Sequence, residues 1–338
     1  MKKIIVTGGA GFIGSNLILK LFKDHPDWTI MNIDKLTYAS DHSHLKPLKD
    51  SERYYFKKID LINREEVQDI VKSFKPDGVF HLAAESHVDN SITGPEPFIQ
   101  SNVVGTFNIL EECRQLWQED EKAWKVNRFV HVSTDEVYGE LKDDGFFTEE
   151  TPYAPNSPYS ASKASSDMIV RAYFHTYGMN VVTTNCSNNY GPHQHDEKLI
   201  PTVIRSAIQH NPIPVYGTGQ NIRDWLNVID HCSAMETAFM KGKAGETYNI
   251  GGNNEWKNLD LVHKICDILN EEVGKGPDGD YKNLINFVTD RLGHDFRYAI
   301  DASKIKRELE WEPNPDFDGM LRDTILWYVK KYNDSIKN

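Results

Sequence analysis

The stretch Thr7-Gly-Gly-Ala-Gly-Phe-Ile-Gly14 decides the fold of this 338-residue chain. It follows the apolar run Lys3–Thr7, whose β-branched residues predict a buried strand. It leads directly into Gly14–Phe22, where apolar residues recur at three- and four-residue steps and predict an amphipathic helix. A glycine-rich turn between a buried strand and a helix is the usual start of a dinucleotide-binding unit.

The glycines of this turn have the spacing of a phosphate-binding motif. Gly9, Gly11 and Gly14 fit the pattern G-x-G-x-x-G, and Gly8 gives the variant Gly8-x-x-Gly11-x-x-Gly14. In the first pattern the leading glycine permits a tight turn, the second lets backbone approach a pyrophosphate, and the third lets helix pack on strand. The N–H groups at the start of the helix then face the phosphates.

Asp34 indicates which dinucleotide this turn binds. It lies 20 residues after Gly14, at the end of the second predicted strand. A carboxylate at that position can accept hydrogen bonds from both ribose hydroxyls and would repel a 2′-phosphate. The sequence therefore favours NAD over NADP.

The first half of the chain alternates short β-branched runs with longer amphipathic runs, as βαβ units with a parallel sheet do. The predicted strands are Lys3–Thr7, Trp28–Ile33, Tyr54–Ile59, Gly78–His81, Arg128–Ser133 and Asn180–Asn185. The predicted helices are Gly14–Phe22, Arg64–Phe74, Phe98–Trp117 and Ser160–Tyr177. We therefore expect an α/β fold with a doubly wound, Rossmann-type parallel sheet.

The pattern of the sequence changes after about Tyr190. Shorter elements are separated by Gly191-Pro192, Asn211-Pro212 and Tyr216–Gly219, and a further strand is predicted at Ile285–Val288. We expect an NAD-binding Rossmann domain over residues 1–190, to which segments from about 225–255 return. A smaller, mainly substrate-binding lobe is expected over residues 191–338.

The composition excludes several function classes. The formal net charge of −12 argues against nucleic acid and anionic membranes as partners, because both require a basic surface. No apolar stretch approaches the ~20 residues that span a bilayer. The four cysteines lack the spacing of a zinc site or a disulfide framework, and His87, His193 and His195 lack carboxylate-rich ligand spacing. These features predict a cytoplasmic protein with reduced thiols and no bound metal.

Tyr159 and Lys163 are the first catalytic candidates. They are four residues apart, so on a helix they share one face about 6 Å apart. The lysine ammonium is expected to lower the pKa of the tyrosine and to hold a ribose hydroxyl, so that the phenolate can act as a base toward a sugar alcohol. Tyr54 and Lys58 have the same spacing but lie in a predicted strand, where they would be roughly 13 Å apart.

The segment Ser133–Glu136 is the second candidate. It ends a predicted strand, and the carboxyl ends of parallel strands are where open α/β sheets bind ligands. A helix N-cap run would look the same. Beside a nicotinamide site, one of the two adjacent carboxyl groups, Asp135 or Glu136, could stay protonated as an acid while the other served as a base. That pair would equip the site for an elimination.

Nine segments spread over most of the chain match one protein family. They are TGGAGFIGS at Thr7–Ser15, HLAAESHVDNSI at His81–Ile92, STDEVYG at Ser133–Gly139, YSASKA at Tyr159–Ala164, NCSNNYGP at Asn185–Pro192, EKLIP at Glu197–Pro201, RDWL at Arg223–Leu226, YNIGG at Tyr248–Gly252 and DRLGHD at Asp290–Asp295. On these residues the chain resembles the extended short-chain dehydrogenase/reductase family and, within it, the nucleotide-sugar 4,6-dehydratases.

This resemblance implies a three-step reaction on a nucleotide sugar with one tightly held NAD that is not consumed. Tyr159, next to Lys163, would take the proton of the carbon-4 hydroxyl, and Thr134 would hydrogen-bond the carbon-4 oxygen. Glu136 would remove the carbon-5 proton, and Asp135 would protonate the departing carbon-6 hydroxyl. Hydride returned to carbon 6 would give a 4-keto-6-deoxy sugar.

The resemblance also implies two sets of contacts. The cofactor contacts are Gly8, Gly11, Phe12, Ile13, Gly14, Asp34, Lys35, Leu36, Thr37, Asp60, Leu61, Leu82, Ala83, Ala84, Glu85, Ser86, Ser101, Tyr159, Lys163 and Asn189. The substrate contacts are Ser86, Thr134, Asn188, Lys198, Leu199, Pro214, Val215, Tyr216, Arg223, Asn258, Asp290, Arg291 and His294. Lys198, Arg223 and Arg291 would supply the cations for the diphosphate.

The family pattern has a proline where this chain has Leu292, so that loop is expected to be less preorganised. A homodimer built from the helices Phe98–Trp117 and Ser160–Tyr177 is also implied by the family. Two rivals share the fold, NAD and the Tyr-x-x-x-Lys pair: a 4-epimerase and a UDP-glucuronate decarboxylase. Asp135 distinguishes them, because epimerisation expels no water and family decarboxylases typically have serine there. A non-catalytic nucleotide sensor is the alternative from another class.

Overall fold

The structure is a computed structural model that describes residues 2–290 and 293–337. Its centre is a seven-stranded sheet in the order β10-β6-β5-β4-β1-β2-β3, and every neighbouring pair is parallel. The strands are β1 (Lys3–Thr7), β2 (Thr29–Asp34), β3 (Tyr54–Lys58), β4 (Gly78–His81), β5 (Arg128–Thr134), β6 (Val181–Cys186) and β10 (Thr247–Ile250). The predicted doubly wound, Rossmann-type sheet is confirmed. The strand order reverses between β1 and β4, and ligands bind outside the carboxyl ends of strands at such a point.

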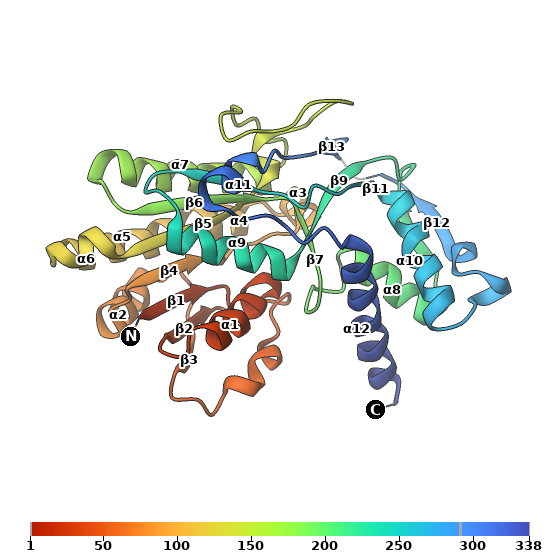
Figure 1. The fold of residues 1–338 in the computed structure, drawn as a ribbon, viewed down its shortest axis with the longest axis horizontal. Coiled ribbons are helices and arrows are strands. Elements are labelled where there is room, and N and C mark those ends of the chain that lie inside the picture. Colours follow the sequence, from red (N-terminus) through yellow and green to blue (C-terminus); the bar gives the residue numbers. More distant parts are fainter. Residues whose placement is uncertain (1, 291–292, 338) are drawn as a thin grey trace.

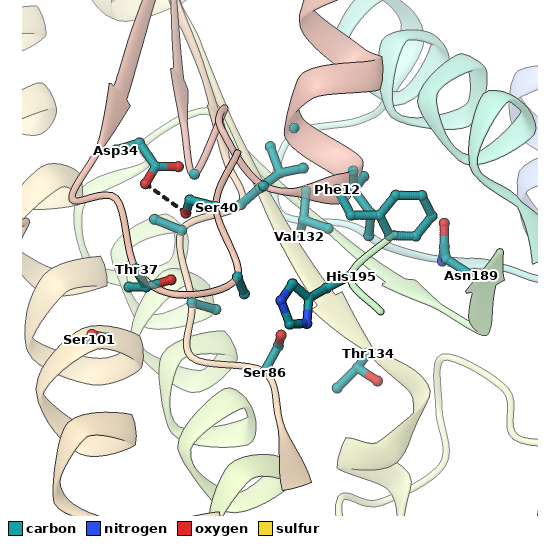
Figure 2. A pocket seen from close by; sticks show the side chains of 18 of the residues that line it. Phe12, Asp34, Thr37, Ser40, Ser86, Ser101, Val132, Thr134, Asn189 and His195 are labelled. Atoms are coloured by element: carbon teal, nitrogen blue, oxygen red, sulfur yellow. Dashed lines mark hydrogen bonds between the residues drawn. The ribbon is translucent and has the colours of Figure 1, made fainter. Parts of the chain in front are cut away.

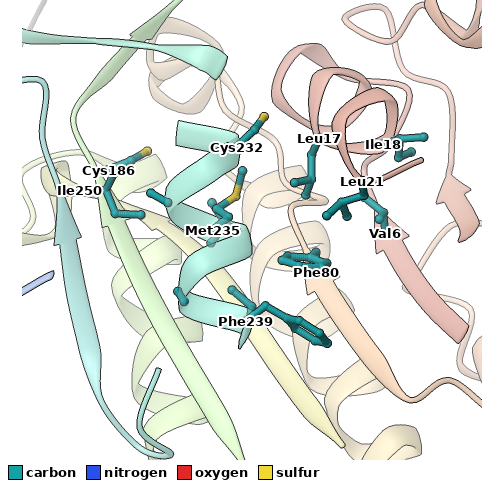
Figure 3. Packing of buried hydrophobic residues seen from close by; sticks show 14 of the residues in the cluster. Val6, Leu17, Ile18, Leu21, Phe80, Cys186, Cys232, Met235, Phe239 and Ile250 are labelled. Atoms are coloured by element: carbon teal, nitrogen blue, oxygen red, sulfur yellow. The ribbon is translucent and has the colours of Figure 1, made fainter. Parts of the chain in front are cut away.

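Helices cover both faces of this sheet (Figure 1). One face packs against α1 (Phe12–Asp24), α9 (Val228–Lys241) and α11 (Ser303–Leu309). The other packs against α2 (Arg64–Phe74), α5 (Gly105–Gln118) and α7 (Pro158–Tyr177). Figure 3 shows the first of these layers, in which Leu17 and Leu21 of α1 and Phe239 of α9 lie around Phe80 of β4. Burial of these apolar side chains holds the carboxyl ends of the strands in fixed positions.

The predicted helix Phe98–Trp117 is interrupted in the structure. It consists of α4 (Glu96–Phe98), a π-helical segment η2 (Ile99–Val104) and α5. Two adjacent side chains of this π-helical segment make contacts with the rest of the site. Ser101 lines a cavity at the carboxyl ends of the strands, and buried Asn102 accepts a hydrogen bond from the Glu85 N–H at 2.8 Å. A single α-helix was therefore the wrong prediction for the first turns, where the side chains serve the neighbouring loop.

The other local predictions differ from the structure by a residue or two at element ends. Strand β2 includes Asp34 as its last residue, and β6 extends to Cys186. Tyr54 and Lys58 lie in β3, as predicted, so this pair is held apart by extended backbone. Between the main elements lie η1 (His42–Leu48), α3 (Val88–Thr93), α6 (Glu121–Val126) and η3 (Asp135–Tyr138).

The chain after Tyr190 adds a second hydrophobic cluster beside the sheet. The elements that contribute to this cluster are β7 (Asn188–Tyr190), α8 (Leu199–Ile208), β8 (Ile213–Tyr216), β9 (Ile222–Asn227), β11 (Glu255–Lys257), α10 (Asn258–Glu272), η5 (Tyr281–Leu284), β12 (Ile285–Val288) and α12 (Phe317–Lys337). The same part of the chain also contains η4 (Pro277–Gly279) and β13 (Arg297–Tyr298). The predicted strand Ile285–Val288 is confirmed, and it pairs in parallel with β8. The division into two domains at residue 190 stays a prediction. Within the described residues, no helix is both long and apolar enough to cross a membrane.

Candidate active site

Neighbouring atoms in the turn between β1 and α1 leave no room for side chains at three of its glycines. Gly8 has φ +70°, and a Cβ there would lie 2.8 Å from the Cα of Ala83 on the loop after β4. A Cβ on Gly14 would lie 2.3 Å from the carbonyl oxygen of Gly8, and one on Gly9 would lie 2.3 Å from Asn32 Oδ1. The tight turn is therefore at Gly8, and the prediction that placed it at Gly9 was wrong. Gly9 and Gly14 are instead packing positions.

Gly11 has a different environment from its neighbours. Among the described residues, chain neighbours aside, the one heavy atom within 4 Å of a Cβ built on it is the Gly8 carbonyl oxygen at 3.2 Å, and Gly11 lines the cavity beside this turn. It is also the N-cap residue of α1, with no side-chain cap. The first N–H groups of α1 therefore have no intrahelical acceptor and can face a phosphate in that cavity.

The cavity runs along the carboxyl ends of the central strands (Figure 2). Of the predicted cofactor contacts, Leu36 and Glu85 do not line it, and the others do: Gly8, Gly11, Phe12, Ile13, Gly14, Asp34, Lys35, Thr37, Asp60, Leu61, Leu82, Ala83, Ala84, Ser86, Ser101, Tyr159, Lys163 and Asn189. In the described part of the chain, no arginine lines this cavity. The Asp34 carboxylate, which would repel a 2′-phosphate, lines the cavity, in agreement with the choice of NAD over NADP.

Asp34 is held rigidly at one side of the cavity. Its carboxylate accepts hydrogen bonds from the Ala10 N–H at 3.0 Å, the Leu36 N–H at 2.8 Å and the Ser40 hydroxyl at 3.1 Å (Figure 2). Leu36 itself has φ +58°, which is unusual for a branched residue. Leu36 does not line the cavity, and its contribution is the backbone N–H that helps to fix the Asp34 carboxylate.

Lys35 and Glu85 join the two loops on either side of the β1 turn. Lys35 Nζ lies 2.9 Å from Glu85 Oε1 and donates a hydrogen bond to Ser101 at 2.7 Å. The loops that carry Lys35 and Glu85 follow β2 and β4, the strands that flank β1. Glu85 was predicted as a cofactor contact, but in the structure it acts on the loop through this ion pair.

Tyr159 and Lys163 share one face of α7 and both line the cavity, as predicted. A capping box between Ser157 and Ser160 starts the helix just before Tyr159. Burial raises the pKa of Tyr159 well above its usual range, with the negative charge of Glu136 as the next cause, and the influence of the Thr134 hydroxyl opposes the shift. Burial dominates the net shift, and the expectation that Lys163 lowers this pKa stays a prediction.

A buried carboxylate lies beneath Lys163. Asp167 is one helical turn further along α7 and accepts hydrogen bonds from Ser133 Oγ at 2.8 Å and Tyr153 Oη at 3.0 Å, with His131 Nε2 at 2.9 Å. Burial lowers the pKa of Lys163, and the negative charge of Asp167 opposes that shift. Asp167 therefore favours the charged form of Lys163.

Thr134, Asp135 and Glu136 lie where β5 turns into η3. Thr134 caps the turn by accepting a hydrogen bond from the Glu136 N–H at 3.4 Å, and its hydroxyl donates to Asp135 Oδ1 at 3.3 Å. Thr134 is therefore the N-cap residue of η3, and this local role is compatible with a catalytic role for the same segment. Thr134 and Glu136 line the cavity, whereas Asp135 lies just behind its wall.

Asp135 has the environment of a neutral acid. It is 2% exposed, and burial followed by the charge of Glu136 raises its pKa well above the usual range of an aspartate. Within the part of the chain that the structure describes, its buried Oδ2 has no hydrogen-bond partner. A protonated carboxyl group with one unpaired oxygen can donate a proton to a bound substrate.

The predicted substrate contacts divide into two groups. Ser86, Thr134, Asn188 and Lys198 line the same cavity as the cofactor contacts. The remaining described ones lie outside it, on or beside β8, β9, α8, α10 and the segment before β13: Leu199, Pro214, Val215, Tyr216, Arg223, Asn258, Asp290 and His294. Arg291 and Leu292 lie outside the described residues, so the expectations for them stay untested.

Arg223 shows how the second group is organised. Its guanidinium donates hydrogen bonds to the carbonyl oxygens of Asp295 at 2.8 Å and Phe296 at 3.2 Å, and it lies 4.3 Å from the ring centroid of Tyr298. Asp290 and His294 are joined by an ion pair of 2.6 Å. The cation predicted to hold a diphosphate is thus anchored on the loop that carries Asp290.

Several residues that line the cavity were missed by the sequence analysis: Ile33, Ala39, Ser40, Ile59, Val132, Cys186, Ser187, Gln194, His195 and Glu197. His195 was interpreted only as a loop histidine, but its ring lies 5.5 Å from that of Tyr38 and faces the cavity (Figure 2). His193 instead stacks on His44 at 3.9 Å. Among the described residues there is no group of three or more His, Cys, Asp or Glu side chains able to hold a metal.

These observations converge on one class of protein. The parallel sheet reverses its strand order beside the glycine turn, and Asp34, Tyr159 and Lys163 line one cavity at that edge. This combination of fold and site defines the short-chain dehydrogenases/reductases, as the sequence resemblance implied.

Comparison with known proteins narrows this class. The chain matches the family described as GDP-mannose 4,6 dehydratase over residues 5–324, and it belongs to that family. A dTDP-glucose 4,6-dehydratase of Salmonella typhimurium is 52% identical over 337 residues, covering 97% of this chain and 92% of the relative. A solved dTDP-glucose 4,6-dehydratase of Bacillus anthracis in complex with NAD is 44% identical, with 98% of both chains covered and a TM-score of 0.86. The corresponding structure from Streptomyces venezuelae, with NAD and TYD bound, is 40% identical with the same coverage and a TM-score of 0.88.

Proposed function

We propose that this protein is an NAD-dependent dTDP-glucose 4,6-dehydratase, a hydro-lyase that forms dTDP-4-keto-6-deoxyglucose. The observation that carries the proposal is buried Asp135, whose pKa is raised by burial, next to Glu136 and beside the Tyr159–Lys163 pair. An oxidation site alone is common to many relatives. An added acid and base at the same cavity supports loss of water from the oxidised sugar. Relatives named for this activity support the same conclusion.

The cofactor site fits NAD. Gly11 leaves room for backbone to approach a pyrophosphate, and Asp34 offers a fixed carboxylate to a ribose. When bound, NAD supplies a hydride acceptor for carbon 4 and a donor for carbon 6, together with a positive ring charge that favours the Tyr159 phenolate. Lys163 lies four residues from Tyr159 on the same helix and can hold the ribose beside it.

The protein groups divide the proton transfers among them. Tyr159 accepts the proton of the carbon-4 hydroxyl, and Thr134 holds the carbon-4 oxygen. The resulting ketone acidifies carbon 5, from which Glu136 takes a proton. Asp135 protonates the carbon-6 hydroxyl as it leaves as water, and its raised pKa keeps that proton available near neutral pH.

The sugar nucleotide extends from the cavity toward the second group of predicted contacts. Lys198 and Arg223 provide cations for the diphosphate, and Pro214, Val215 and Tyr216 are assigned to the base. Anchoring of Arg223 on the Asp295 and Phe296 carbonyls keeps that cation in place in a protein of net charge −12.

The decisive experiment incubates purified protein with dTDP-glucose and no added NAD, and looks for the 4-keto-6-deoxy product by mass spectrometry. Product formation is expected because the cofactor is recycled within each turnover. No product from dTDP-glucose, combined with turnover of UDP-glucose or UDP-glucuronate, would overturn the assignment in favour of an epimerase or a decarboxylase.

A sensor without catalysis is the competing class. Tyr159→Phe tests it, because this change removes only the phenolic oxygen. The dehydratase proposal expects turnover to fall by about 10²–10⁴-fold, the usual contribution of a general base, with retained NAD. Ligand responses and NAD retention equal to those of the wild type, together with no turnover by either protein, would instead favour the sensor.

We also infer that two copies associate through α5 and α7, and that the protein acts in the cytoplasm. The two helices pack together and expose large apolar side chains: Phe107 (36%), Met168 (50%) and Tyr177 (44%). All four cysteines are free and buried, which suits a reducing compartment. Light scattering should give twice the chain mass of 38.7 kDa, and Met168→Glu should give the single mass.

A further inference from the structure

The loop Leu82–Ser86, which follows β4, forms one wall of the cavity: Leu82, Ala83, Ala84 and Ser86 all line it. Its role as a cofactor contact rests on the proposed function, which makes NAD the ligand of this wall. The loop has no regular secondary structure, so its backbone groups need partners on other elements. Two buried side chains, Thr7 and Asn102, supply them.

Thr7 holds the first end of this loop. Its Oγ1 accepts hydrogen bonds from the N–H groups of Leu82 and Ala83, each at 3.2 Å. Thr7 is the last residue of β1 and directly precedes Gly8 of the glycine turn. One hydroxyl group therefore fixes the loop relative to the turn that is proposed to bind phosphate.

Asn102 of η2 holds the other end of the loop. Its Oδ1 accepts a hydrogen bond from the Glu85 N–H at 2.8 Å. Its Nδ2 donates to the Glu85 carbonyl at 3.0 Å and to Ser162 Oγ at 2.8 Å. Ser162 precedes Lys163 on α7 and donates to the Tyr159 carbonyl at 2.7 Å. The second end is thus fixed relative to the helix that carries the proposed catalytic pair.

His81 connects the two contacts. It is the last residue of β4, and its Nδ1 lies 2.7 Å from Thr7 Oγ1 while its Nε2 lies 2.8 Å from Thr106 Oγ1. Thr106 in turn donates a hydrogen bond to the Asn102 carbonyl at 2.6 Å. His81, Thr106 and Asn102 are each 1% exposed, and Thr7 is fully buried. These four residues therefore form one buried chain of hydrogen bonds from the glycine turn toward α7.

The partners of His81 specify its protonation state. A carbonyl oxygen only accepts, so the Thr106 hydroxyl hydrogen is committed to Asn102, and His81 Nε2 must carry the hydrogen that Thr106 accepts. Both lone pairs of Thr7 Oγ1 face backbone N–H groups, so its own hydrogen goes to His81 Nδ1. A charged ring would have a hydrogen on Nδ1 as well, for which Thr7 has no acceptor left. Burial also lowers the pKa of His81 well below its usual value, and the nearby charges of His131 and Lys163 act in the same direction.

We propose that His81, as a neutral imidazole with its hydrogen on Nε2, is a positioning residue that holds both ends of the loop Leu82–Ser86 and thereby retains NAD. His81 does not line the cavity, so it acts through Thr7 on one side and through Thr106 and Asn102 on the other. Breaking either link should let the loop move relative to α7. NAD should then leave the protein faster.

The first experiment compares Thr106→Val, which keeps the branched shape without the hydroxyl, with Thr106→Ser, which keeps the hydroxyl. Each purified protein is loaded with radiolabelled NAD and diluted into excess unlabelled NAD, and the loss of label is followed. Thr106→Val should release NAD roughly tenfold faster than the wild type, because it leaves a buried N–H of His81 without its acceptor. Thr106→Ser should release NAD at the rate of the wild type.

The control for a loss of stability alone is Ile265→Val. Ile265 is a fully buried residue of α10 in the second hydrophobic cluster, and it has no part in the hydrogen-bond chain. This variant leaves a small cavity and should lower the urea midpoint without changing NAD release. Equal NAD release from Thr106→Val and Thr106→Ser would overturn the proposal. Faster release from Ile265→Val, in proportion to its lower urea midpoint, would also overturn it.

A double variant tests whether His81 and Thr106 act in one chain. His81→Phe keeps a flat ring but removes both nitrogen atoms, so it should release NAD at least as fast as Thr106→Val. Because the link is then already broken, adding Thr106→Val to His81→Phe should change the release rate by less than about twofold. Effects that multiply would contradict a single chain. If His81→Phe does not fold, the Thr106 pair and the histidine spectrum decide the question.

Nitrogen-15 NMR of histidine-labelled holoprotein reads the tautomer directly. The His81 signals, assigned by their change in Thr106→Val, should show hydrogen on Nε2 alone between about pH 6 and 8. Hydrogen on Nδ1, or a ring that titrates in this range, would overturn the proposal. The spectrum and the NAD release need no substrate. A wild type that gives the expected results in both but forms no product from dTDP-glucose would overturn only the proposed function.

Discussion

Lys163 Nζ donates a hydrogen bond to the backbone carbonyl of Val132 at 2.8 Å. Val132 precedes Thr134 by two residues on β5, so the lysine of α7 is fixed directly to the strand that presents the acid and base pair. This contact joins the residues proposed for the oxidation to those proposed for the elimination. Asp167, one turn beyond Lys163 on α7, is joined to the same strand because its carboxylate accepts a hydrogen bond from Ser133 Oγ.

The charge of Asp167 should set the upper pH limit of activity. Burial lowers the pKa of Lys163 and Asp167 opposes it, so Asp167→Asn should lower that pKa further. Because the charged lysine is the active form, activity is lost as pH rises through this pKa, and the loss should begin about one pH unit lower in the variant. The pH profile of kcat measures this. Tyr153→Phe removes one donor to Asp167 but keeps the carboxylate, and an equal shift in both variants would contradict the charge argument.

Asp135→Asn should separate the two halves of the reaction. An amide cannot give up a proton to the leaving hydroxyl, so water loss should slow by about 10²–10⁴-fold, while carbon-4 oxidation should slow much less. The near-ultraviolet absorbance of reduced nicotinamide should therefore accumulate after mixing with dTDP-glucose. Equal slowing of both steps would contradict the acid role of Asp135.

The same variant should be more stable than the wild type at neutral pH. The folded-state pKa of Asp135 is raised, so above the unfolded pKa of about 3.9 the unfolded chain releases this proton more readily than the native state, which lowers the free energy of unfolding. Below that pH both states hold the proton, and the advantage of Asp135→Asn should disappear. Urea unfolding at several pH values tests this. A stability difference that is constant across pH would show that the carboxyl charge is not its cause.

Two glycines of the β1–α1 turn should respond differently to alanine. Gly14→Ala drives a methyl group against the Gly8 carbonyl, so the free energy of unfolding should fall by about 1–3 kcal/mol. Gly11 has φ −79°, and a Cβ there would meet the Gly8 carbonyl oxygen at 3.2 Å, a milder contact than that of Gly14, so Gly11→Ala should cost less, about 1 kcal/mol, as an N-cap change. Gly11→Ala should nevertheless lose co-purifying NAD. The free energy of unfolding and the co-purifying NAD should be measured in both variants. If the two variants change in the same way in both measurements, the separate roles of Gly11 and Gly14 are contradicted.

Local patterns were sufficient for the fold and for much of the site. The strand, turn and helix around Gly8–Gly14 are adjacent in sequence, and strand periodicity distinguished Tyr54 and Lys58 from Tyr159 and Lys163. The cofactor contacts implied by the family resemblance mostly line the cavity for the same reason, because they lie at the ends of strands in a regular parallel sheet.

Contacts between distant segments were not predictable. The turn is at Gly8 because Ala83 approaches it from the loop after β4, and nothing in the spacing of the glycines records that approach. His195 reaches the cavity through packing of its loop against Tyr38. The pKa of Tyr159 depends on how deeply α7 is buried against β5, which a four-residue spacing cannot express.

The base-binding candidates Pro214–Tyr216 lie in the two-stranded sheet β12–β8, which shares no strand with the sheet that carries Thr134. Substitutions in the β12–β8 sheet can therefore change which nucleotide is bound without altering the proposed proton-transferring groups on the seven-stranded sheet. Descendants of such a protein inherit their chemistry and acquire their substrates separately.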